Sequence, residues 1–146
     1  MIIKVKSKRS LIGIMLTGFV ISMVGCQGNG PPTYTVKGDL QLEGGDISLL
    51  AGGTVEAALE SDPTIRAAGE IKPDGSFTLE TLQNGAMVKG AREGKFQVRI
   101  VLPDDDAKAR RLAAKEIAPR FLSFDKSELS LKSPSSGEIK LKVSKQ

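Results

Sequence analysis

The strongest pattern in the chain is an alternation of apolar and polar residues that begins at residue 34. A period of two is typical of β-strands with one face buried and the other in water. The alternation recurs in seven segments, which predict strands at residues 34–43, 55–60, 65–72, 76–80, 96–102, 129–131 and 139–144. Short strands separated by turns rich in Gly and Pro favour an all-β sandwich or barrel over an α/β fold.

The same alternation predicts which side chains form the core. The apolar members of each segment share one face, and we expect that face to lie between two sheets. The predicted inward set is Val36, Leu40, Leu42, Val55, Leu59, Ile71, Phe77, Leu79, Phe96, Val98, Ile100, Leu129, Leu131, Ile139, Leu141 and Val143.

One segment departs from the period of two. Residues 107–117 are rich in Ala, Leu, Lys, Arg and Glu, three acidic residues precede them, and Pro119 follows. Acidic residues before a helix and basic residues within it favour the helix dipole, so we expect one short helix at about residues 105–117, on a loop between strands. The run Asp104–Asp106 offers oxygen ligands for calcium, but it lacks the spacing of a calcium loop, and capping of the helix accounts for it better.

Two turns are predicted from their residue types. Pro73, Asp74 and Gly75 combine a fixed φ, a turn-forming side chain and tolerance of positive φ, so they predict a structural turn that closes a tight hairpin between Ile71 and Ser76. Asp74 is interpreted as a turn former rather than a ligand. Residues 133–137 predict a second hairpin between the last two strands.

The first 26 residues indicate export. Residues 1–10 contain four basic residues and no acidic one, residues 11–24 are predominantly apolar, and Gly25 and Cys26 follow. This is the layout of a signal peptide, and the apolar run is shorter than the roughly 20 residues of a membrane-spanning helix. Residues 23–26, Met-Val-Gly-Cys, resemble the lipobox of bacterial lipoproteins, in which the cysteine is acylated with fatty acids such as palmitate and becomes the mature N-terminus.

These features predict three parts of the chain: a lipoprotein signal peptide at residues 1–25, a flexible tether at 26–33 and a β-sandwich domain at 34–146. Cys26 is the only cysteine, so lipidation at Cys26 explains an otherwise unpaired thiol in an exported protein. An unmodified cysteine remains the alternative. Gln27, rather than Asp, follows the cysteine, and by resemblance to lipoprotein sorting this favours anchoring in the outer membrane.

Removal of the leader also changes the charge. The chain has 21 basic and 17 acidic residues, a net charge of +4. Four of the basic residues and none of the acidic ones lie in residues 1–25, so the remainder has equal numbers of each. Binding to nucleic acid depends on an excess of basic side chains, and we therefore expect no nucleic-acid partner.

Four segments resemble carboxypeptidase regulatory-like domains, which share the prealbumin (transthyretin-like) sandwich. Residues 45–55 resemble the opening motif of these domains, residues 71–79 (Ile-Lys-Pro-Asp-Gly-Ser-Phe-Thr-Leu) their hairpin, and residues 94–100 a strand. Residues 118–131 are similar to the tail of short bacterial lipoproteins that carry the domain. The resemblance implies a seven-stranded, Ig-like or prealbumin-like sandwich with no catalytic role at a bacterial surface, and it implies no particular ligand.

The residue types present argue against an enzyme. The chain has no histidine, which removes the commonest general base and the commonest metal ligand, and we expect no catalytic residue, metal or cofactor. We therefore expect a lipid-anchored structural or protein-interaction module of the cell envelope, bound to the membrane through Cys26, with another envelope protein or glycan as its partner. The alternatives are a module that binds an envelope glycan or peptide and, less favoured, a hydrolase.

Overall fold

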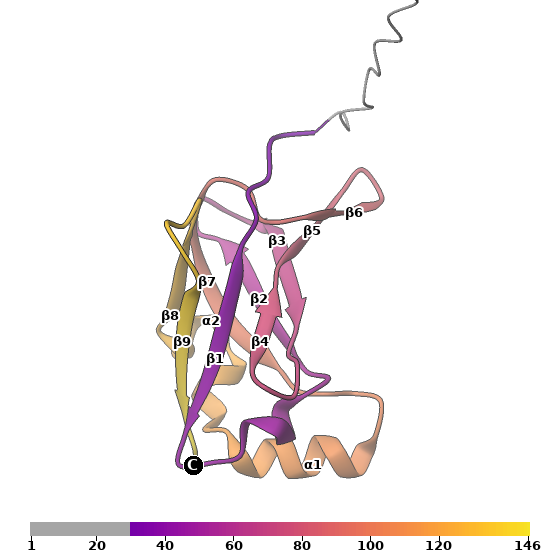
Figure 1. The fold of residues 1–146 in the computed structure, drawn as a ribbon, viewed down its shortest axis with the longest axis vertical. Coiled ribbons are helices and arrows are strands. Elements are labelled where there is room, and N and C mark those ends of the chain that lie inside the picture. The colour runs from indigo at the N-terminus through magenta and orange to yellow at the C-terminus, as the bar shows by residue number, and fades with distance from the viewer. Residues whose placement is uncertain (1–29) are drawn as a thin grey trace, which may run out of the picture.

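Two β-sheets face each other across an apolar core in the computed structural model, which describes residues 30–146 (Figure 1). The larger sheet has the strand order β6-β5-β3-β2-β7-β8, and the smaller has the order β4-β1-β9. The strands are β1 Lys37–Glu43, β2 Thr54–Leu59, β3 Asp62–Glu70, β4 Ser76–Thr78, β5 Glu80–Gln83, β6 Ala86–Lys89, β7 Gly94–Val101, β8 Leu129–Ser133 and β9 Ile139–Ser144. The fold is thus the all-β sandwich that the alternation predicts.

The core is built from the predicted inward faces. Of the sixteen predicted residues, Leu42, Leu129 and Ile139 are partly buried against the core, and all the others are buried. The core also includes residues that the alternation did not identify, from connections between strands. The largest of these are Leu50, Ile117 and Phe121. They lie in or beside short helices, whose apolar positions do not follow a period of two.

Two of the helices close the end of the sandwich where β1 and β9 finish. Helix α1, Ala107–Glu116, is the predicted helix, and Asp106 caps it by accepting a hydrogen bond from Lys108 N. It packs against the 3₁₀ helix η1, Ile47–Leu50. After α1 come the 3₁₀ helix η2, Pro119–Leu122, and the single-turn α2, Phe124–Ser127, which the sequence pattern did not predict.

The smaller sheet joins the first described strand to the last one. β1 runs parallel to β9 over the register Gly38↔Ile139 to Glu43↔Ser144 and antiparallel to β4. Close packing requires glycine at position 38, since a Cβ there would lie 2.3 Å from Cζ of Phe77. The smaller sheet therefore depends on contacts between segments far apart in the chain.

Both predicted hairpins are turns, but they join strands of different sheets. The turn at Pro73–Gly75 links β3 of the larger sheet to β4 of the smaller, and residues 134–138 link β8 to β9 in the same way. The prediction of two paired hairpins was wrong in this respect. Local turn chemistry determines that the chain reverses, whereas the core determines which strand becomes the partner.

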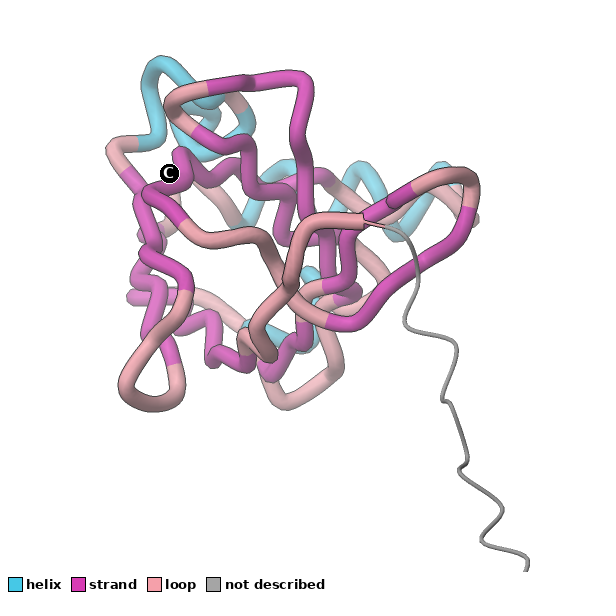
Figure 2. Tube along the Cα trace, turned by 90° about the horizontal axis from the view of Figure 1, so that it is seen from above, coloured by secondary structure: helices cyan, strands magenta, loops and turns pink. Residues whose placement is uncertain are grey.

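The structure adds two strands to the seven predicted ones. β5 and β6 form a hairpin that projects from the sandwich, as the views in Figures 1 and 2 both show. Asn84 and Gly85 connect its strands with φ values of 50° and 80°. Positive φ at both positions is the geometry of a two-residue type I′ turn.

Candidate functional site

The described chain begins beside the projecting hairpin, at the end of the sandwich opposite α1 (Figure 1). Gln83 Nε2 of β5 donates a hydrogen bond of 3.2 Å to Pro31 O, and Thr33 Oγ1 donates one of 2.9 Å to Lys89 O of β6. Residues 30–33, the described part of the predicted tether, are thus held against the hairpin. Cys26, the predicted lipidation residue, lies outside the described residues.

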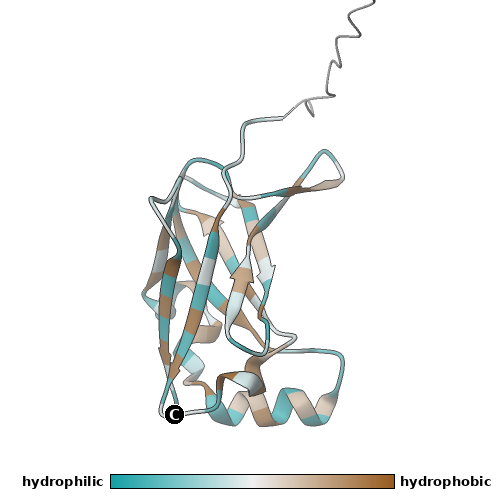
Figure 3. Ribbon diagram, in the orientation of Figure 1, coloured by the Kyte–Doolittle hydropathy of each residue, from teal (hydrophilic) through white to brown (hydrophobic). Residues whose placement is uncertain are grey.

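The β5–β6 hairpin reverses the usual polarity of a strand. Thr81 and Gln83 point inward and are buried, whereas Leu82 and Met87 are 64% and 59% exposed. The buried Thr81 Oγ1 donates a hydrogen bond of 2.7 Å to Gly90 O. Leu82 and Met87 lie directly opposite each other in the strand register, so the outer face of the hairpin carries an apolar pair. Figure 3 shows apolar colouring on this projecting segment.

The predicted structural turn lies toward the other end of the molecule. Asp74 accepts hydrogen bonds from Ser76 N at 2.9 Å and from Ser76 Oγ at 2.7 Å. Both hydrogen bonds lower the pKa of Asp74, and the bond from the Ser76 hydroxyl group has the larger effect. Gly75 has a φ of +89° and packs against Leu40 O. Pro73, Asp74 and Gly75 therefore serve the turn, which binds to β1 through the hydrogen bond from Leu40 N to Gly75 O.

A carboxylate on the outer face of the larger sheet binds two arginines. Glu56 of β2 accepts hydrogen bonds of 2.6 Å from Arg66 of β3 and from Arg99 of β7. Both guanidinium groups lie against the ring of Phe124, with Cζ 5.3 Å and 4.8 Å from its centroid. Cations over an aromatic face are attracted to it, so this cluster fastens α2 to the sheet.

The contacts with the two arginines also lower the pKa of Glu56. Burial would raise its pKa, but the hydrogen bonds and positive charges of Arg66 and Arg99 outweigh burial and lower the pKa below 4.5. A carboxylate held ionised in this way is a poor general acid near neutral pH. The cluster is therefore better suited to holding the fold together than to catalysis.

We expect Glu56→Gln to lower the free energy of unfolding at pH 7 by about 1–2 kcal/mol, a modest value because Arg66 is half exposed to screening solvent. Because the folded pKa is lowered, the contribution of the carboxylate is fully present above pH 4.5 and is lost as the pH falls through the folded pKa. The difference from wild type should therefore shrink in acid. Urea unfolding followed by circular dichroism at several pH values measures it.

Glu60→Gln is the matched control for this prediction. Glu60 forms an ion pair with Lys95 at 3.1 Å, but the two side chains are 35% and 63% exposed. Exposed pairs of this kind contribute less than about 1 kcal/mol. Equal effects of the two substitutions, or a Glu56→Gln effect that does not change with pH, would show that the arginine cluster does not stabilise the fold.

A hollow of about 440 Å³ opens at the edge between β3 and β4. Its wall is mostly polar and carries both signs of charge, with Lys37, Glu70 and Glu138 among its residues. In the part of the chain that the structure describes, no three His, Cys, Asp or Glu side chains are grouped closely enough to hold a metal ion. Among residues 30–146, no helix combines the length and the apolar composition needed to cross a bilayer.

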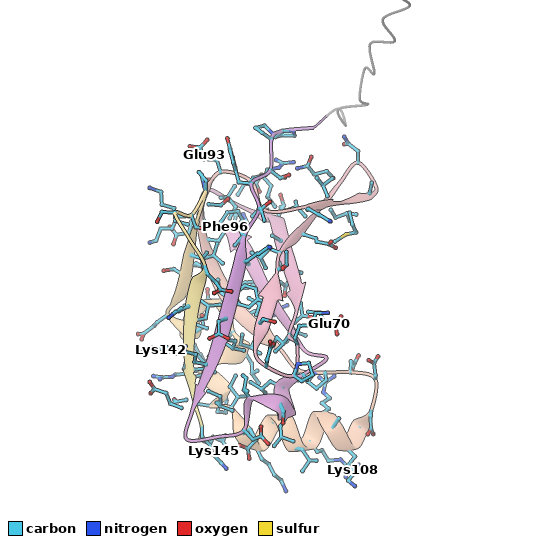
Figure 4. All side chains as sticks on the ribbon, viewed as in Figure 1. Glu70, Glu93, Phe96, Lys108, Lys142 and Lys145 are labelled. Atoms are coloured by element: carbon cyan, nitrogen blue, oxygen red, sulfur yellow. The ribbon has the colours of Figure 1, made fainter. Side chains whose placement is uncertain are left out.

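The two ends of the sandwich differ in what they present. Lys108 and Lys145 lie at the α1 end, whereas Glu93 lies at the end where the described chain begins (Figure 4). Lys145 forms an ion pair of 3.0 Å with Glu116 of α1, which ties the helix to the residue after β9. At the α1 end, the helix is thus attached to the segment after β9 by an ion pair, whereas the hairpin end carries the exposed apolar pair.

Comparison of the chain with protein-family models, with curated proteins and with solved structures finds no match.

The alternation of apolar and polar residues does not predict the β5–β6 hairpin. Asn-Gly between two short segments with alternating side chains is the strongest local signal for a two-residue β-hairpin, and Asn84-Gly85 stands between Leu82 and Met87 in this way. Its strands were overlooked because their inward residues, Thr81 and Gln83, are polar. A search for turn residues rather than for apolar faces finds it.

Proposed function

We propose that the protein is a lipid-anchored, non-catalytic β-sandwich of the bacterial cell envelope that acts as a structural or protein-interaction module. The observation that carries this proposal is the single cysteine at the end of a leader with the layout of a signal peptide. Acylation of Cys26 supplies the membrane anchor. The resemblance to carboxypeptidase regulatory-like domains supports a binding or structural role.

The arrangement of the sandwich fits an anchored domain. The described chain begins at one end and α1 caps the other (Figure 1). β7 runs between these ends with eight residues, which at about 3.3 Å per residue span roughly 26 Å. An anchor at Cys26 would therefore leave the α1 end away from the membrane, facing the compartment in which envelope partners are found.

The proposal includes the absence of catalysis. The chain has no histidine and a single cysteine, so Ser-His and Cys-His nucleophile pairs are not available to it. The aspartates at positions 46, 62 and 74 each accept two hydrogen bonds from the Ser or Thr two residues later. These carboxylates are committed to local hydrogen bonds, at a helix cap, the start of a strand and a turn, which supports a structural role for these acidic residues.

Cys26→Ser tests the anchor. The full chain, expressed with its leader in bacteria fed a clickable fatty acid, should carry the label and sediment with the membranes. We expect Cys26→Ser to lose both, because two acyl chains anchor a protein stably and their removal leaves no comparable attachment. In-gel fluorescence and membrane fractionation measure the two effects.

A relocated cysteine is the control for this experiment. The double variant Cys26→Ser, Ser135→Cys carries one cysteine on the loop between β8 and β9. It should remain unlabelled, because acylation requires the cysteine at the end of the leader. Equal labelling of wild type and Cys26→Ser would refute the lipid anchor.

The second candidate function is binding of an envelope glycan or peptide. The hollow at the β3–β4 edge favours it, because its polar wall offers hydrogen-bond donors and acceptors of both charges. Retention on isolated envelope glycan that is reduced by Glu70→Ala, with Glu43→Ala as an exposed control outside the hollow, would favour this function over protein interaction.

A further inference from the structure

We propose that the β5–β6 hairpin rests against the surface of the membrane, with Leu82 and Met87 in contact with lipid. The inference rests on the proposed lipid anchor at Cys26 and extends it: the anchored domain would have a defined second contact with the bilayer rather than hanging from its tether alone. Chain length, polarity and charge support it in turn.

The length of chain before the described residues places the hairpin within reach of the anchor. Four peptide links separate Cys26 from Gly30, so the two residues can be at most about 14 Å apart. Gly30 lies at the tip of the hairpin, since a Cβ added there would be 2.2 Å from Gln83 Oε1 and 3.8 Å from Asn84 Nδ2. The hairpin tip is therefore close to the bilayer when Cys26 is acylated.

The hydrogen bond from Gln83 to Pro31 limits how far the hairpin can move from the anchor. Gln83 is buried, and its side chain donates to Pro31 O at 3.2 Å. Pro31 therefore lies on the face of the hairpin that carries Gln83. Leu82 alternates with Gln83 along β5 and points to the opposite face, so the tether does not cover the apolar pair.

The exposed apolar pair of the hairpin is not explained by contact with water. An ordinary surface strand turns its polar side chains outward, whereas here Thr81 and Gln83 are buried and Leu82 and Met87 are the most exposed large apolar residues in the described chain. Exposed apolar residues that lie side by side mark contacts with a partner or a membrane. Next to a lipid anchor, a bilayer is the apolar phase that is always present.

The charged pair of the hairpin lies farther from its turn than the apolar pair does. Glu80 and Lys89 face each other in the register, on the same side as Leu82 and Met87 but two residues farther from the turn. The apolar pair is thus nearest the tip, and an exposed lysine lies behind it, where it can reach lipid phosphates while its stem lies along the surface. Glu80 offsets the charge of Lys89, so the apolar pair supplies the main attraction to the bilayer surface and the lysine adds a contact with phosphates.

The experiment places a fluorescent probe on the hairpin of the full lipoprotein. Leu82→Cys is expressed with its leader, purified in detergent, labelled with a thiol-reactive fluorophore and reconstituted into vesicles of phosphatidylethanolamine and phosphatidylglycerol that contain a shallow doxyl-labelled lipid. Leu112→Cys on α1 is the matched control, because it replaces another exposed leucine, at the opposite end. Circular dichroism checks that both variants are folded.

We expect the doxyl lipid to quench the probe at residue 82 at least threefold more strongly than the probe at residue 112. Equal, weak quenching at both positions in a chain with acylated Cys26 would overturn the hairpin contact and leave the anchor intact. Protection of residue 82 by a co-purifying protein, in place of quenching, would also overturn it. Label stoichiometry distinguishes failure of the anchor itself: an acylated Cys26 leaves one reactive thiol per chain, whereas a free Cys26 gives two.

Discussion

Phe96→Ala should destabilise the domain by about 3–5 kcal/mol, which is a large part of the 5–15 kcal/mol that holds a typical domain together. The ring of Phe96 is fully buried, and β7 places it between Leu59 of β2 and Leu131 of β8. Its loss leaves a cavity that three strands border. Urea unfolding of the chain from Gln27 onward, followed by far-UV circular dichroism, measures the change.

Phe124→Ala is the control for this substitution. Phe124 lies on the outer face against two arginines, and it is only partly buried. We expect its removal to cost about 1–2 kcal/mol, because cation–π contacts at such sites and partial burial are each worth about 1 kcal/mol. An unchanged unfolding midpoint for Phe96→Ala would place its ring outside the core and contradict the register of β7.

Gly75→Ala should cost about 2–5 kcal/mol, the sum of a positive-φ penalty and a steric clash. Gly75 has a φ of +89°, and a Cβ there would lie 2.4 Å from the backbone oxygen of Leu40. The clash also strains the 2.9 Å hydrogen bond from Leu40 N to Gly75 O, through which the turn is attached to β1. The same urea unfolding experiment measures the loss.

Gly85→Ala separates the two causes. Gly85 has a φ of +80°, similar to that of Gly75, but no atom lies within 4 Å of the position of its Cβ. It should therefore show only the φ penalty of about 1–2 kcal/mol. If the two glycines gave equal losses, the contact between the turn and β1 would contribute nothing to stability.

The sequence predicts what depends on local physics. Alternation identified strands such as β1 and β7, because a strand between water and a core must place apolar residues at every second position. The helix was identified from its composition and its Asp cap. The turn at Pro73–Gly75 was identified because few residue types adopt its backbone geometry.

The sequence does not predict what depends on partners distant in the chain. Which strand pairs with β4 or with β9 is decided by how the two sheets fill the core, so turns that look like hairpins connect different sheets. Leu50 of η1 and Ile117, which follows α1, are buried where these helices cover the end of the sandwich. The residues next to them in the sequence do not predict this burial. The β5–β6 hairpin was not predicted because its inward residue Gln83 is polar. Gln83 is buried through its hydrogen bond to Pro31, a contact across 52 positions of the chain.

The parallel pairing of β1 with β9 determines when this protein can fold. β1 has six register partners in β9 and only three in β4, so its main neighbour is a strand whose residues come 101 positions later in the chain. Contacts so far apart in sequence form late and slow folding. Until the ribosome has released Val143, the central strand of the smaller sheet lacks most of its hydrogen bonds. Under the proposed export, this delay keeps the domain open to the translocation machinery until β9 has followed β1 across the membrane.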